Sequence, residues 1–217
     1  MNQPNPAAIL FDLDGTLVDT APDFVFVVNQ LRQQYKLEQL PGGCIRDQVS
    51  NGGSALTRLT WGINDDDPEF PKRRSELLDC YSSHLGAASG YFPGFSAVLA
   101  ELELLGIQWG IVTNKPRRFT EPLLERLDIE PASLVCADDV KNAKPAPDAL
   151  LLGAQKLDCR PADCWYVGDH KRDIEAALAA NMFSIAVLFG YIEPHDDPTS
   201  WGADALIKRP DQLLTLL

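Results

Sequence analysis

Two aspartates stand one residue apart after a short apolar segment near the N-terminus. Residues 7–11 are mostly apolar and favour a buried strand, and Asp12, Asp14 and Gly15 follow it. In an extended chain, Asp12 and Asp14 point to the same side about 6 to 7 Å apart, close enough to share a divalent cation. A polar turn at a strand end would account for Gly15 but not for both acids. The pair therefore predicts a site that does chemistry.

Further polar side chains follow the later predicted strands. They are Thr113, Asn114, Lys144, Asp169 and Asp173. A threonine hydroxyl and free N–H groups at a helix start can bind phosphate oxygens, although Thr113 or Asn114 could equally cap that helix. Lys144 could neutralise a phosphate and lower the pKa of nearby carboxylates, or lie in solvent as most lysines do. Asp169 and Asp173 could face one cation, or complement the dipole of a helix.

From residue 95 onward, predicted helices and strands alternate. Together with the first strand they predict an α/β fold, a doubly wound parallel sheet with right-handed crossovers. Ligands of such sheets bind beyond the carboxyl ends of the strands, and the polar residues above follow those ends. The predicted helices cover residues 95–105, 116–127, 147–157 and 171–180, and the strands cover 108–113, 134–137, 165–167, 184–188 and 205–207.

The stretch between the first strand and these elements has an all-helical pattern. We interpret residues 20–90 as a cap domain inserted into a catalytic core made of residues 1–19 and 91–217. Its predicted helices cover residues 21–36, 47–59 and 71–85, with a break at 51–53. A polar patch there could contact substrate, or could simply begin a kinked helix. It comprises Arg46, Ser50, Asn51, Gly52, Gly53 and Ser54.

Charge and composition narrow the class of function. The chain has 19 basic and 31 acidic residues and a net charge of −12, which disfavours nucleic acids and anionic membranes as partners. Any anionic substrate would therefore need a local cationic pocket. Five cysteines without a C-x-x-C pair indicate reduced thiols in a cytoplasmic protein, and no apolar segment suggests secretion or membrane insertion. These patterns leave open whether the protein is a monomer or a homodimer.

Four segments resemble, in order, the motifs of the haloacid dehalogenase superfamily. FDLDGTLVD resembles the first motif, VTNKP the second, KPAP the third and GDHKRD the fourth. The resemblance runs from Ala8 to Leu217 and implies a Rossmann-like core with an inserted helical cap. His170 departs from the pattern, because many relatives have Ser or Thr at this position. Its role is therefore open, and it could face solvent.

The resemblance implies an enzyme that hydrolyses phosphomonoesters in two steps. Asp12 would attack phosphorus and form an aspartyl-phosphate. Asp14 would donate a proton to the leaving alcohol and would then activate the hydrolytic water. Thr113 would bind the phosphate, together with Asn114 and Lys144.

The resemblance also implies a metal site made of oxygen atoms. Asp12, the backbone carbonyl of Asp14 and Asp169 would hold the ion, and Asp173 would support them through water or Lys144. Hard oxygen donors of this kind suit Mg²⁺. Zinc is disfavoured, because the sequence offers no His/Cys cluster.

Two substrate classes remain open. FDLDGTLVDTAP, NGG and VTNKP resemble the phosphoglycolate phosphatase branch, which favours a phosphatase acting on a small phosphorylated metabolite. The tail FGYIEPHDDPTSWGADALI is closer to N-acetylmuramic acid 6-phosphate phosphatases, which are the alternative. Three other functions are less favoured. A dehalogenase normally lacks an acid at the position of Asp14, a sugar-phosphate mutase usually has histidine at that of Phe24, and a dead binding module commonly loses an acid or the lysine.

Overall fold

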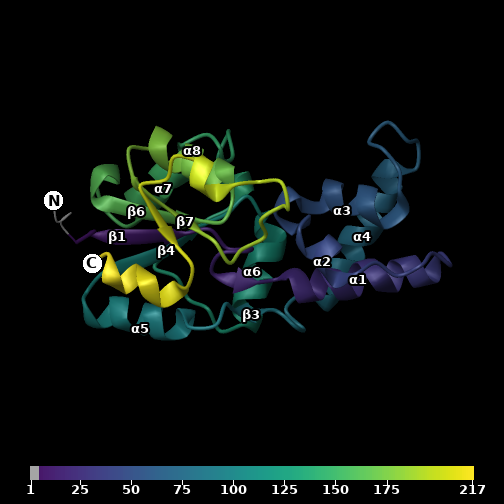
Figure 1. Ribbon diagram of the computed structural model, residues 1–217, viewed down its shortest axis with the longest axis horizontal. Coiled ribbons are helices and arrows are strands. Elements are labelled where there is room, and N and C mark those ends of the chain that lie inside the picture. Colours follow the sequence, from purple (N-terminus) through teal and green to yellow (C-terminus); the bar gives the residue numbers. More distant parts are fainter. Residues whose placement is uncertain (1–4) are drawn as a thin grey trace.

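The computed structural model describes residues 5–217 and has a six-stranded parallel sheet at its centre (Figure 1). The strand order is β5-β4-β1-β6-β7-β8, so β1 lies in the middle between β4 and β6. The strands are β1 (Ala8–Phe11), β4 (Gln108–Val112), β5 (Ser133–Val135), β6 (Cys164–Gly168), β7 (Phe183–Val187) and β8 (Ala205–Ile207). This arrangement confirms the predicted parallel α/β fold.

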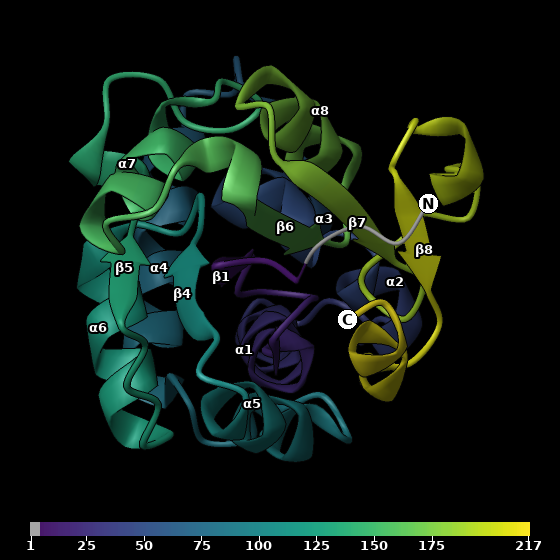
Figure 2. The ribbon, with the colours of Figure 1, turned by 90° about the vertical axis from the view of Figure 1, so that its left-hand side faces the viewer.

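Helices cover both faces of the sheet, because the central strand is apolar on both sides. In β1, Ile9 and Phe11 face one core, and Ala8 and Leu10 face the other. Helices α5 and α6 pack into the first core, and α7 and α8 into the second. Figure 2 shows α7 and α8 on the opposite side of the sheet from α5. These helices are α5 (Phe95–Leu104), α6 (Arg117–Arg126), α7 (Asp148–Lys156) and α8 (Lys171–Ala179).

A helical insert lies beyond the carboxyl end of the sheet, on the right in Figure 1. The chain leaves the core through the short strand β2 (Val18–Asp19) and returns through β3 (Gly90–Tyr91), and these two strands pair antiparallel. The exact domain boundaries at residues 19/20 and 90/91 stay a prediction. The insert contains α1 (Ala21–Gln34), α2 (Gly42–Arg46), α3 (Gly52–Trp61) and α4 (Phe70–His84).

The predicted helix over residues 47–59 was wrong in its extent. The structure has the short helix α2 before this range, a 3-10 turn at Val49–Asn51, and α3 starting only at Gly52. Gly52 has φ of +75°, which lies outside the helical range and which glycine adopts readily. The glycine therefore ends the turn and starts a new helix in another direction.

A buried carboxylate ties the two ends of the insert together. Asp23, in the first turn of α1, is fully buried. It accepts hydrogen bonds from the backbone N–H groups of Gly86 at 2.6 Å and Ala88 at 2.7 Å, and from the hydroxyl of Ser89 at 2.5 Å. Because three donors satisfy it, the charge can be buried without leaving unpaired oxygen atoms.

Within residues 5–217, no helix is both long enough and apolar enough to cross a membrane.

Candidate active site

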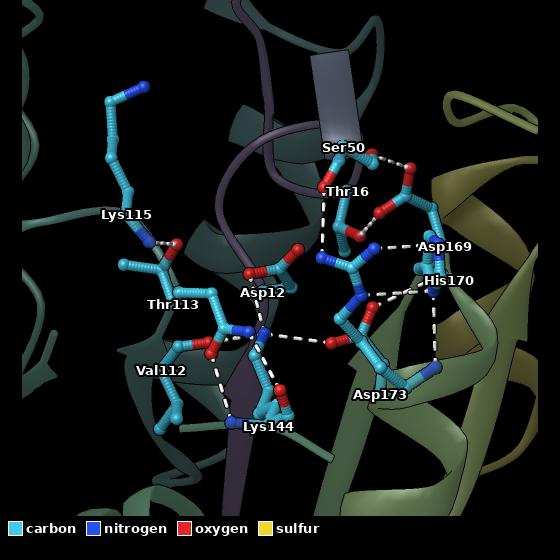
Figure 3. Close-up of polar contacts among 12 residues, drawn as sticks. Asp12, Thr16, Ser50, Val112, Thr113, Lys115, Lys144, Asp169, His170 and Asp173 are labelled. Atoms are coloured by element: carbon cyan, nitrogen blue, oxygen red, sulfur yellow. Dashed lines mark hydrogen bonds and ion pairs between the residues drawn. The ribbon is translucent and has the colours of Figure 1, made fainter. Parts of the chain in front are cut away.

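The predicted site residues meet at the carboxyl end of three adjacent strands. Asp12 follows β1, Thr113 follows β4 and Asp169 follows β6, and β1 lies between the other two. The N–H of Asp12 donates to the carbonyl of Val167 at 2.9 Å, which continues the pairing of β1 with β6. Figure 3 shows the side chains of Asp12, Lys144 and Asp173 converging at this edge.

Lys144 is the central cation of the cluster, and its side chain is only 1% exposed. Its Nζ lies 2.8 Å from Oδ1 of Asp12 and 2.7 Å from Oδ1 of Asp173. It also lies 2.7 Å from the hydroxyl of Tyr166 and 3.1 Å from the carbonyl of Val112. Burial lowers the pKa of Lys144, but the charges of the two aspartates outweigh it and raise the pKa overall. Lys144 is therefore held charged beside Asp12.

Asn114 positions this lysine through its backbone. Its side-chain amide donates to the carbonyl of Lys144 at 2.9 Å and accepts from the N–H of Lys144 at 3.0 Å. Both polar atoms of the Asn114 side chain are thus engaged. Thr113 is buried and its hydroxyl accepts the N–H of Lys115 at 3.1 Å. The predicted phosphate contacts of Thr113 and Asn114 stay predictions.

Three carboxylates lie close enough to hold a metal ion. Ligand atoms of Asp12, Asp169 and Asp173 all lie within 4.8 Å of one another. Burial raises the pKa of Asp12 to about 6, against the opposing charge of Lys144. Burial and the charges of the other two acids raise the pKa of Asp169 to about 8. Because one lysine does not balance three acids, the site favours a further cation.

Asp169 is fixed in place by groups from the first turn and from the C-terminal loop. Its carboxylate accepts hydrogen bonds from the hydroxyl of Thr16 at 3.1 Å and from the N–H of Tyr191 at 2.8 Å. Gly15 makes this approach possible, since its φ is +86° and an added Cβ would lie 2.1 Å from Oδ2 of Asp169. The glycine of the D-x-D-G segment thus serves both the turn and the acid cluster.

Asp14 points into a separate network that reaches the insert. Its Oδ1 accepts hydrogen bonds from the hydroxyl of Thr20 at 2.5 Å and from Nζ of Lys115 at 2.8 Å. Lys115 also lies 2.8 Å from the hydroxyl of Tyr81 in α4, and the Tyr81 ring stacks on Phe24 of α1. The side chain of Asp14 therefore lies apart from the three-acid cluster. Its predicted backbone contact with a metal stays a prediction.

Sequence reasoning missed the roles of Lys115 and Tyr81. Neither residue was among the predicted site residues. Burial raises the pKa of Tyr81 to about 12, so its hydroxyl stays protonated beside Lys115. The position of Lys115 directly after Thr113 and Asn114 was the one available signal, since all three follow the same strand end.

The predicted contacts in the insert divide into two groups. Asn51, Gly52 and Gly53 line the same cavity as Asp12. Arg46 is not part of this lining, and its guanidinium instead pairs with Asp19 at 2.9 Å. The prediction that Arg46 contacts substrate stays a prediction.

His170 is half-buried and caps α8, which answers the question that the sequence left open. Its Nδ1 accepts the N–H of Arg172 at 3.1 Å, and burial lowers the pKa of its ring so that the neutral form is favoured. Arg172 in turn donates to the carbonyl of Ser50 at 2.9 Å and to the side-chain oxygen of Asn51 at 3.3 Å. The start of α8 thus holds the insert against the core.

These groups surround one cavity of about 330 Å³, the size of a small-metabolite site. Its floor is formed by Asp12, Asp14, Asp173 and Lys144, and its walls come from the insert and from α6. Among the lining residues are Phe24, Leu78, Tyr81, Pro116 and Phe119 as apolar groups, and Arg74, Arg118 and Arg172 as cations. The cavity can therefore receive an anion at the floor and a larger, partly apolar body above it.

Comparison with known proteins finds relatives that are named as phosphatases. An N-acetylmuramic acid 6-phosphate phosphatase of Pseudomonas aeruginosa is 41% identical over 97% of this chain and 94% of that protein. A phosphoglycolate phosphatase of Xanthomonas campestris pv. campestris is 39% identical over 96% and 95%. The crystal structure of a predicted phosphoglycolate phosphatase from Haemophilus somnus superposes with a TM-score of 0.84 at 24% identity, covering 97% of each chain, which supports the fold.

A family model described as haloacid dehalogenase-like hydrolase matches residues 9–187. The match includes Asp12, the helical insert, and β6 with Asp169, and it ends before Tyr191, whose N–H holds Asp169. The phosphatase relatives extend over nearly the whole chain. The chain therefore belongs to the haloacid dehalogenase-like hydrolases and is a phosphatase of that family.

Proposed function

We propose that this protein removes the phosphate of N-acetylmuramic acid 6-phosphate. The main support is its similarity over nearly its full length to two phosphatases named for that substrate, at 41% and 38% identity. The cavity supports the same substrate, since its lining extends from Asp12 and Asp173 to side chains of α4. The phosphoglycolate phosphatase first favoured by the sequence is the second candidate, because relatives of that name reach 39% identity.

We assign the metal to the three-acid cluster and infer that it is Mg²⁺. Asp12, Asp169 and Asp173 offer only carboxylate oxygens, which suit a hard divalent cation. Burial, together with the charges of the neighbouring acids, raises the pKa values of Asp12 and Asp169, and a bound cation would favour their ionised forms. Bound there, Mg²⁺ would offset the negative charge of the phosphate and polarise its oxygens.

The proposed reaction has two steps, transfer of the phosphoryl group to Asp12 and hydrolysis of the aspartyl-phosphate. In the first, a carboxylate oxygen of Asp12 forms a bond to phosphorus while the bond from phosphorus to the sugar oxygen breaks. Asp14 donates its proton to that departing oxygen. In the second, Asp14 takes a proton from water, whose oxygen attacks phosphorus and releases Asp12 and inorganic phosphate. Lys144 offsets the negative charge beside Asp12 throughout.

The test is phosphate release from a substrate panel, with Mg²⁺ and with EDTA. We expect the highest kcat/KM for N-acetylmuramic acid 6-phosphate, above 2-phosphoglycolate, glucose 6-phosphate and nucleoside monophosphates, and no turnover in EDTA. A clear preference for 2-phosphoglycolate would overturn the substrate assignment in favour of the second candidate. Turnover that is indifferent to EDTA would contradict the metal assignment.

Metal binding should stabilise the protein in a pH-dependent way. The pKa values of Asp12 and Asp169 are raised from 3.8 to about 6 and about 8, so without metal their ionisation destabilises the fold as the pH rises through this range. At pH 8, Mg²⁺ at a hundredfold excess over its Kd should raise Tm by about 5 to 10 °C. At pH 5.5 the rise should be smaller, because protons compete for the same oxygens.

Differential scanning fluorimetry at the two pH values measures this difference. Asp169→Asn is the matched variant, since it removes one ligand charge and should lose most of the shift. An equal Tm rise at both pH values, or an unchanged rise in Asp169→Asn, would contradict the metal assignment.

A further inference from the structure

Two sets of neighbouring arginines lie beside the cavity. The first is Arg73 and Arg74 in α4, and the second is Arg117 and Arg118 in α6. Arg73 forms ion pairs with Glu69 at 3.5 Å and with Glu76 at 3.1 Å. Its neighbour Arg74 lines the cavity and, within residues 5–217, has no carboxylate within 4.0 Å. The hydrogen bond of Arg74 is made by Nε to the hydroxyl of Ser54 at 3.2 Å. Arg74 is exposed, and its charge is free to meet an anion that enters the cavity.

In the second set, at the start of α6, one arginine is again held by carboxylates and the other lines the cavity. Arg117 is held by Glu121 at 2.6 Å and by Asp139 at 3.0 Å. Arg118 lines the cavity, and its guanidinium lies 4.5 Å from the centre of the Phe119 ring. In the described part of the chain, it too has no acidic partner. Arg172 also lines the cavity without a carboxylate partner among residues 5–217, but it donates to Ser50 and Asn51. In a chain with a net charge of −12, the two remaining arginines, Arg74 and Arg118, indicate an anionic ligand.

The position of Arg74 along α4 shows how far this anion lies from the reacting groups. Tyr81, Leu78 and Arg74 are spaced by three and four residues, so they share one side of the helix, and all three line the cavity. Tyr81 marks the inner end, because its hydroxyl meets the lysine that pairs with Asp14. Seven residues of helix place the backbone of Arg74 about 10 Å farther along the axis.

We propose that Arg74 and Arg118 form a subsite for a carboxylate at the far end of the substrate. This inference rests on the proposed function. N-acetylmuramic acid 6-phosphate carries a lactyl carboxylate on O3, separated by several bonds from the phosphate on C6. In 2-phosphoglycolate the carboxylate is attached to the same carbon as the phosphate ester, too close to the phosphorus to reach this end of the cavity.

Guanidinium groups suit this task, because their planar forks match a carboxylate in a bidentate geometry. One arginine comes from the insert and the other from the core, so a bound carboxylate would contact both parts of the protein. The subsite would therefore select for the lactyl group and would disfavour sugar phosphates that lack it.

The test compares two substrates that differ only in the lactyl group. The kcat/KM values for N-acetylmuramic acid 6-phosphate and N-acetylglucosamine 6-phosphate are measured for the wild type, Arg74→Gln and Arg118→Gln. We expect each variant to lower the ratio of the two values about tenfold, since a hydrogen bond to a charged group is lost. Arg74→Lys should restore part of the ratio, because it keeps the charge.

Arg73→Gln and Arg117→Gln are the matched controls. Each removes the same charge one residue away but outside the cavity lining, so the ratio should stay at the wild-type value. Equal losses on both substrates in Arg74→Gln and Arg118→Gln would show that these arginines serve the phosphate, and would overturn the subsite. An unchanged ratio would overturn it as well. If the wild type itself fails to prefer N-acetylmuramic acid 6-phosphate, the proposed function falls first, and that result is visible without any variant.

Discussion

Asp12→Asn should lower phosphatase turnover by at least about 10⁴-fold while leaving the protein folded. The amide cannot form the acyl-phosphate, and loss of a covalent nucleophile has effects of this order. The fold should persist, since burial already raises the pKa of Asp12 to about 6 and the substitution removes a buried negative charge. Lys144 keeps Asp173 as its partner at 2.7 Å. Steady-state kinetics and thermal unfolding test the two halves of this expectation.

Asp14→Asn separates the roles of the two acids. With 4-nitrophenyl phosphate the leaving group needs no proton, so Asp12 should still be phosphorylated in this variant. The second step should be slow, and intact-protein mass spectrometry should detect one added phosphoryl group. Asp12→Asn should show none. A phosphoryl group on the Asp12→Asn protein, or turnover within tenfold of the wild type without deamidation, would contradict Asp12 as the nucleophile.

Lys144→Met should be the most destabilising single substitution at the site. It leaves the carboxylates of Asp12 and Asp173 without the cation that contacts both at 2.7 to 2.8 Å. Breaking a buried ion pair in this way costs about 3 to 5 kcal/mol of the free energy of unfolding. For a protein of this size, Tm should fall by about 6 to 20 °C. Turnover should be lost as well, because no charge then offsets the phosphate beside Asp12.

The pH dependence of the loss in stability of Lys144→Met identifies its cause. Removing the cation raises carboxylate pKa values further, so the deficit in stability should be largest at pH 8 and should shrink toward pH 5 as the acids take up protons. Lys141→Met is the matched control, since this lysine is exposed and lies three residues earlier. A deficit that is the same at both pH values would point to lost packing of the lysine stem, and would contradict the electrostatic account.

The core of the fold and much of the site follow from local patterns. Apolar strands that alternate with helices specify a parallel sheet, and the carboxyl ends of its strands bring Asp12, Thr113 and Asp169 together. Lys144 reaches the same point because it follows β5, the next strand of the sheet. These residues were predicted to meet because they follow the carboxyl ends of parallel strands, whereas the strand order itself comes from the structure.

The contacts between insert and core could not be predicted in the same way. Tyr81 meets Lys115, and Arg46 pairs with Asp19, only because α4 and α2 have particular orientations against the sheet. Helical periodicity shows which side of a helix is apolar, but not which polar group beyond it will be reached. The break at Gly52 was visible as a glycine pair, but its effect depends on a left-handed φ that the sequence pattern does not report.

The buried carboxylate of Asp23 also makes the insert a transferable unit. Its three hydrogen bonds connect the first turn of α1 to residues 86–89, so the outgoing and returning ends of the insert are joined inside the insert itself. A chimera that exchanges the insert between relatives keeps this joint when its crossover points lie at β2 and β3. Crossovers placed inside α1 or after α4 would separate the acid from its donors, and recombination would then cost stability before it changed specificity.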